Sequence, residues 1–137
     1  MEYRIPENAV ILEIQPDYEE RQGYNNLIGL CIKTDEGDVK ILISDGQACC
    51  EDYGYLFLET PDDINKFIGA RIVKIEDVCI GLSADTSGYG FDCGGETQLK
   101  VTTTKGVLHF AVYNSHNGYY GHATFVQVFN TVEKDCL

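Results

Sequence analysis

The sequence predicts an α+β domain built mostly of antiparallel β meanders and hairpins, with one short helix packed on the sheet. Segments rich in Val, Ile, Phe, Tyr and Thr recur between clusters of Gly, Asn and Asp, which is typical of strands joined by turns. Only the segment 60–69 carries the start and stop signals of a helix. A length of 137 residues suits one hydrophobic core, so residues 1–137 are expected to form a single domain.

Three strands are expected before the helix. The first, residues 10–15, ends at Pro16, which lacks the N–H group that a strand ladder uses. Residues 27–34 and 39–44 follow as a hairpin, because Gly37 supplies the left-handed residue that the turn between them requires.

The expected helix spans residues 60–69. Thr60 can cap its first turn, Pro61 suits the first helical position, and Gly69 ends it. Apolar side chains spaced three and four residues apart share one face of this segment, which predicts that the helix covers the sheet.

The second half of the chain is expected to form a strand and then a meander. Residues 71–80 form the strand, and the Gly- and Ser-rich residues 81–95 form a loop. The meander has turns at Lys105-Gly106 and at Asn117-Gly118, the second being a strong hairpin signal. Its expected strands are 98–104, 107–113 and 119–129. In the middle strand Leu108, Phe110 and Val112 occupy alternate positions, as a sheet with two different faces requires.

The charge balance excludes one class of partner. Ten basic and 22 acidic residues give a net charge of −12, which repels a DNA or RNA backbone, so no polymeric nucleic acid is expected. The longest apolar run, residues 9–12, is too short to cross a bilayer, and residues 1–4 lack the pattern of a signal peptide. We therefore expect a cytoplasmic location, no membrane partner, and six cysteines in the thiol form.

Two polar clusters are not explained by the strand pattern. In the first, residues 44–51, Cys49 or Cys50 could be a nucleophile activated by a histidine, or the pair could bind a metal together with His116 and His122. The acidic surroundings favour the neutral thiol, and the spacing of a metal site is absent. We expect a structural turn here, with no catalysis, no metal and no cofactor.

The second cluster, residues 113–122, combines tyrosines, amides and imidazoles at a hairpin tip. It is either an ordinary exposed hairpin or a binding surface, since tyrosine can stack on a planar ligand and amides provide adaptable hydrogen bonds. A nucleotide suits such a surface. Its phosphates could be contacted by backbone N–H groups of glycine turns and by the basic residues Arg4, Arg21, Lys100 and Lys105. The expected ligand-binding residues are Tyr113, Asn114, Ser115, Asn117, Tyr119, Tyr120, Lys105 and Arg21.

Four motifs carry a resemblance to a known family. They are Gln47-Ala48-Cys49-Cys50-Glu51, Ile64-Asn65-Lys66-Phe67-Ile68-Gly69, Lys105-Gly106 and Ser115-His116-Asn117-Gly118-Tyr119-Tyr120. Over residues 25–128 the chain resembles an uncharacterised domain family of phage and bacterial proteins. It departs from the family pattern at His116 and at Gly121-His122, and the resemblance implies no particular activity.

The function expected from the sequence is binding without catalysis. By analogy of class, small phage proteins of this composition include sponges that sequester cyclic nucleotide signals of bacterial immunity, and a homo-oligomer would fit this role. The alternatives are a protein-binding inhibitor or scaffold that uses a strand edge or its acidic surface, and a cysteine- or metal-dependent enzyme.

Overall fold

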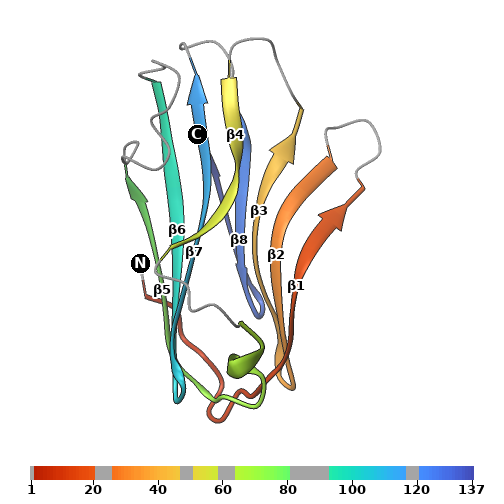
Figure 1. The fold of residues 1–137 in the computed structure, drawn as a ribbon, viewed down its shortest axis with the longest axis vertical. Coiled ribbons are helices and arrows are strands. Elements are labelled where there is room, and N and C mark those ends of the chain that lie inside the picture. Colours follow the sequence, from red (N-terminus) through yellow and green to blue (C-terminus); the bar gives the residue numbers. More distant parts are fainter. Residues whose placement is uncertain (1, 21–25, 47–50, 59–63, 81–92, 117–120) are drawn as a thin grey trace.

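The chain folds into two antiparallel β sheets that face each other as a sandwich (Figure 1). The computed structural model describes residues 2–20, 26–46, 51–58, 64–80, 93–116 and 121–137. One sheet has the strand order β1-β2-β3-β8-β9, and the other has the order β4-β7-β6-β5. The strands are β1 (Ile11–Glu19), β2 (Asn26–Thr34), β3 (Gly37–Asp45), β4 (Glu51–Leu58), β5 (Ile72–Ile80), β6 (Cys93–Thr103), β7 (Gly106–His116), β8 (Ala123–Val128) and β9 (Thr131–Cys136).

The core lies between the two sheets and follows from the alternation of side chains along each strand. In β3, Ile41 and Ile43 are fully buried in this core. In β7, Leu108, Phe110 and Val112 face them from the second sheet. The apolar alternation predicted for residues 107–113 therefore marks the buried face of β7.

The predicted α+β class is wrong, because the described residues are almost entirely antiparallel strands. The only helical element among them is η1 (Ile64–Phe67), a single 3₁₀ turn of four residues. It lies at one end of the sandwich, shown in green at the bottom of Figure 1, where the Phe67 ring enters the core. The cap signals at residues 59–63 fall outside the described residues.

Backbone pairing with β1 explains why this helix stops after one turn. The N–H of Gly69 donates to the carbonyl of Ile11 at 2.7 Å, and the N–H of Ile11 donates to Ala70 at 2.9 Å. Groups that bond to a neighbouring segment are unavailable for a further helical turn. Directly after Phe67, the chain therefore pairs with β1 instead of continuing as a helix.

Two strands, β4 and β9, were absent from the sequence prediction. Several of the predicted strands are longer than expected: β6 begins at Cys93 rather than at residue 98, β7 continues past residue 113 to His116, and β1 continues through Pro16 to Glu19. Pro16 is tolerated because β1 is an edge strand, where an N–H can be missing without breaking a ladder. β9 forms the edge at the other side of the same sheet.

Candidate functional site

A cleft lies between the edge strands of the two sheets, β5 and β9. Its volume is about 310 Å³. Strands β6 and β8 supply its floor through Thr97, Thr124 and Val126. The two edge strands supply Asp77, Val78, Cys79, Glu133, Lys134 and Asp135. We call this feature the β5–β9 cleft.

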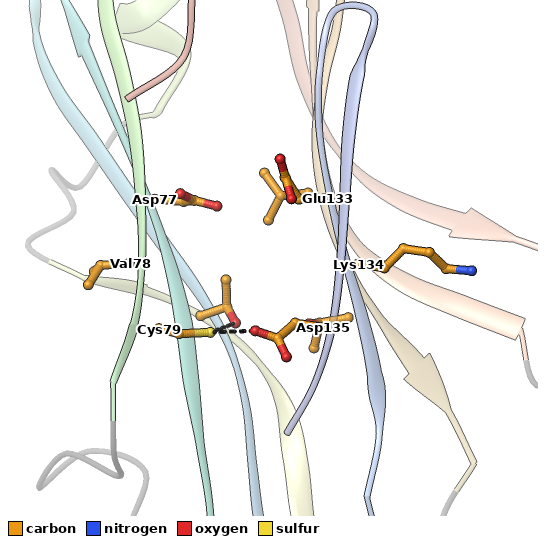
Figure 2. Close-up of a pocket in the computed structure, with 9 residues that line it drawn as sticks. Asp77, Val78, Cys79, Glu133, Lys134 and Asp135 are labelled. Atoms are coloured by element: carbon orange, nitrogen blue, oxygen red, sulfur yellow. Dashed lines mark hydrogen bonds between the residues drawn. The ribbon is translucent and has the colours of Figure 1, made fainter. Parts of the chain in front are cut away.

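The alternation of each edge strand gives the β5–β9 cleft an acidic interior. Figure 2 shows Asp77 and Cys79 pointing from β5 toward β9, and Glu133 and Asp135 pointing back toward β5. Lys134 points away from the cleft, as the next residue of a strand must. Three carboxylates therefore face the cleft, and the ammonium of Lys134 lies 5.2 Å from the centre of the Phe125 ring instead.

Two of these acids are held by hydrogen bonds. The Tyr3 hydroxyl donates to Asp77 Oδ2 at 2.6 Å, and burial together with this bond raises the pKa of Tyr3 above its ordinary range. The Cys79 thiol lies 3.3 Å from Asp135 Oδ2 and 3.1 Å from the Thr97 hydroxyl. Side chains fixed in this way give the cleft a defined arrangement of charge before any partner binds.

The chemistry of Cys79 does not suit a nucleophile. Burial raises the pKa of its thiol; the hydrogen bond with Thr97 lowers it, and the hydrogen bond to Asp135 raises it, so that the pKa remains above its ordinary value. A reactive cysteine needs the opposite, namely a cationic neighbour that stabilises the thiolate. Within the described ranges, no group of three or more His, Cys, Asp or Glu side chains is arranged to hold a metal ion.

A second cleft, of about 260 Å³, lies on the outer face of the sheet that contains β5, β6 and β7. Its polar lining includes Gln98, Lys100, His109 and Glu76. His109 Nε2 lies 2.9 Å from Gln98 Oε1, and the Gln98 amide donates in turn to Glu96. We call this feature the outer-face cleft; its amide, imidazole and ammonium groups make it less acidic than the β5–β9 cleft.

The structure places the predicted ligand-binding residues in different environments. Arg21, Asn117, Tyr119 and Tyr120 lie outside the described residues. Asn114 and Ser115 are fully buried, and Tyr113 is half-buried.

Lys105 is separated from these residues. It lies in the β6–β7 turn, where its ammonium donates to the Ile68 carbonyl at 3.0 Å. Asn114 lies nine positions after Lys105, about 30 Å along an extended strand. The structure therefore does not bring Lys105 together with the β7–β8 end of the sandwich.

Asn114 is buried because it joins two strands at that end of the sandwich. Its side-chain amide donates to the Leu137 carbonyl at 3.0 Å, which ties β7 to the end of the chain after β9. Nearby, the His122 ring is 2% exposed and stacks on Tyr53 with ring centroids 4.3 Å apart. His122, considered above as a metal ligand, is thus enclosed by protein.

Sequence reasoning missed both clefts because their residues resemble an ordinary solvated surface. Asp77 and Asp135 are two of 22 acids and are 58 positions apart in the chain. β9 offers little signal, since Val132 is the only large aliphatic side chain in Thr131–Cys136. One signal of β9 was available in the sequence: Thr131 and Val132 are strand-forming residues that begin a second run, separated from β8 by two residues.

Two further expectations concern cysteines and membranes. Cys31, Cys79 and Cys136 are free thiols, and the other three cysteines have no described side chain. Among the described residues, no helix is long and apolar enough to cross a bilayer.

Comparison with known proteins gives one match. No curated protein and no solved structure matches the chain significantly. A family model does match, over residues 8–126, which ends within β8 and leaves β9 outside the match. The chain therefore belongs to the family described as Domain of unknown function (DUF7448).

Proposed function

We propose that this protein is a non-enzymatic binding protein that takes a cationic partner in the β5–β9 cleft. The observation that carries the proposal is the set of three carboxylates, from Asp77, Glu133 and Asp135, that face a cleft of about 310 Å³ between two strand edges. Such a site is electrostatically complementary to lysine or arginine side chains.

The charge of the whole chain supports the same partner class. A net charge of −12 attracts cations over long distances and accelerates their encounter with the protein. Strand edges are also common protein-recognition sites, because their unpaired backbone groups can accept another chain. These features favour the protein-binding role among the functions considered from the sequence.

The proposal predicts that cleft acids control binding of a basic peptide. Hexalysine is the probe, and the double variant Glu133→Gln/Asp135→Asn removes two charges while keeping the side-chain shapes. Because each lost charge pair weakens binding by about 0.5–1 kcal/mol, the Kd should rise about fivefold. Fluorescence anisotropy of labelled hexalysine at low ionic strength measures this change.

A matched control separates the cleft from net charge. Glu13 and Glu36 are exposed residues outside the cleft, so Glu13→Gln/Glu36→Gln changes the net charge equally. The control should raise the Kd by less than twofold. Equal effects of the two double variants would mean that hexalysine binds the acidic surface at large, and the proposed function would be wrong.

A second candidate is capture of a cyclic nucleotide, as a phage-encoded sponge would perform. The outer-face cleft favours it, because Gln98 and His109 offer hydrogen bonds to a base and Lys100 offers a cation to a phosphate. Tyr113 lies on the same face of this sheet, opposite Glu96 of β6.

The nucleotide candidate predicts intact recovery of a captured ligand. The protein is incubated with a panel of cyclic nucleotides, washed, and heated, and the released material is identified by chromatography. Lys100→Ala should reduce the amount captured at least fivefold, since a phosphate contact is lost. Exposed Lys33, which lies on the other sheet, provides the control Lys33→Ala. Cleaved product, or equal capture by both variants, would contradict this candidate.

A further inference from the structure

We propose that the partner binds as an extended segment that adds to β9, antiparallel to it, with a lysine or arginine at every second position. This inference rests on the proposed function, and it specifies the partner's conformation and side-chain pattern. The segment would become the sixth strand of the sheet that now ends at β9.

The backbone of β9 offers bonding groups at defined residues. His122 and Leu137 exchange two N–H···O bonds of 2.9 Å across the β8–β9 ladder. Bonded pairs recur at every second residue of an antiparallel ladder, so Asp135, Glu133 and Thr131 are the β9 residues that bond to β8. Val132, Lys134 and Cys136 therefore direct their N–H and C=O groups to the open edge.

One of these outward groups is already used. The N–H of Cys136 donates to the side chain of Asp135 at 2.8 Å. For Val132 and Lys134, no backbone partner beyond β8 exists among the described parts of the chain. An added strand would therefore bond mainly to these two residues.

The side chains of the added strand would alternate between the two faces of the sheet. Residues opposite Glu133 and Asp135 would point into the β5–β9 cleft, in non-hydrogen-bonded pairs whose side chains approach closely. Basic side chains at these positions would meet both acids and approach Asp77 of β5. Residues opposite Val132 and Lys134 would point away from the cleft.

The cleft floor holds a further polar group. The Thr124 side chain lines the cleft and is 1% exposed. A hydroxyl can accept a hydrogen bond, so a lysine ammonium that enters the cleft could donate to it.

A second copy of the chain fits this edge poorly. Two copies of β9 paired antiparallel about a two-fold axis must place residues of the same face opposite each other. In the two registers that pair most of β9, Glu133 would lie opposite Glu133 or Asp135 of the other copy, and like charges directly opposite are destabilising. The self-association expected from the sequence would have to use another surface.

Two of the other edges, β1 and β5, are less open than β9. β1 carries Pro16, which lacks an N–H, and has a register shift between Ile11 and Glu13. β5 is partly covered, because the N–H of Tyr3 donates to the Ile75 carbonyl at 2.9 Å. Proline, bulges and covering segments are among the protections of a strand edge, and β9 has none of these three. Its inward-pointing acids protect it against neutral or acidic strands, but they attract a basic one.

The first test changes the peptide and leaves the protein intact. Peptide Thr-Lys-Val-Lys-Val-Lys-Thr alternates its charges, and Thr-Lys-Lys-Lys-Val-Val-Thr has the same composition without alternation. The alternating peptide should bind about tenfold more tightly. In the antiparallel arrangement its valines face Val132 and Lys134, so N-methylation of both valines should abolish binding, while N-methylation of two lysines should not.

The second test removes one backbone N–H from the edge of β9. Lys134→Pro deletes the outward N–H of Lys134, and Lys134→Ala removes the same side chain but keeps this group. Lys134→Pro should weaken binding of the alternating peptide at least tenfold, and Lys134→Ala less than threefold. Both variants are first checked by melting temperature; if Lys134→Pro does not fold, the N-methylated peptides decide alone.

The possible results separate this inference from the proposed function. If hexalysine binding depends on Glu133 and Asp135 but neither alternation nor N-methylation matters, the partner is cationic and the added strand is wrong. If N-methylation of the lysines abolishes binding instead, the antiparallel arrangement is wrong. If the cleft acids do not matter for hexalysine, the proposed function fails first.

Discussion

Replacing Gly29 with alanine is expected to destabilise the protein by about 3 kcal/mol or more. Gly29 lies in β2 opposite Leu42 of β3, and a Cβ atom there would lie 1.9 Å from the carbonyl oxygen of Ile41. It would also lie 2.9 Å from the Ile41 carbonyl carbon and 3.0 Å from Leu42 Cα. These are backbone atoms, so no change of rotamer relieves the contact, and β2 and β3 must move apart.

Urea denaturation followed by circular dichroism measures this loss, and Gly121→Ala is the control. At Gly121 the nearest atom to an added Cβ is the Cys136 sulfur, 3.1 Å away at the end of a side chain that can rotate. This control should change the free energy of unfolding by less than about 1 kcal/mol. If Gly29→Ala is as mild as the control, β2 and β3 do not approach each other as described here.

Replacing His122 with alanine is expected to cost about 3 kcal/mol of stability, without creating or removing a ligand site. The Ser44 carbonyl lies 2.5 Å from His122 Nδ1, and because a carbonyl only accepts, Nδ1 carries the proton and donates. The ring also stacks on Tyr53, whose hydroxyl donates to Asp45 Oδ1 at 2.5 Å. Alanine would remove the ring from a buried site and leave the Ser44 carbonyl without this donor.

His122→Phe separates the contribution of the ring from that of the hydrogen bond to Ser44. Phenylalanine keeps a ring against Tyr53 but cannot donate to Ser44, so its cost should be about 1–2 kcal/mol, smaller than that of alanine. Urea midpoints of the two variants and of the original protein give both values. Unchanged midpoints for His122→Ala would show that the histidine is not a structural link between the sheets, and a ligand or metal role would then need to be considered.

Several elements could be predicted from the sequence because their cause is local. The hairpin of β2 and β3 was predicted from its apolar runs and from Gly37, which has a φ of 131° in the structure. The buried face of β7 followed from the alternation of Leu108, Phe110 and Val112. The motifs of residues 25–128 indicated an uncharacterised family, and the match over residues 8–126 confirms that membership at the level of the family.

The helix failed as a prediction because cap signals report only on a segment's two ends. The bonds that Ile11 makes with Gly69 and Ala70 come from more than fifty residues away, and they stop the segment after one 3₁₀ turn. The failure to predict strand β4 also has a local explanation. Tyr53, Tyr55 and Phe57 alternate as a strand requires, but Gly54 interrupts the run, and a glycine inside a run weakens the signal of a strand.

The sequence by itself determined the antiparallel strands of this protein, its acidic charge and its family, because turn residues, alternation and composition act within a few positions of the chain. Only the tertiary structure decided that the strands form two sheets, that Asn114 and Ser115 lie inside the protein, and that Asp77, Glu133 and Asp135 meet across the β5–β9 cleft. The physical reason is that such a cleft depends on which strands become the edges of the two sheets. That choice follows from the pairing of all strands together, and no single segment encodes it.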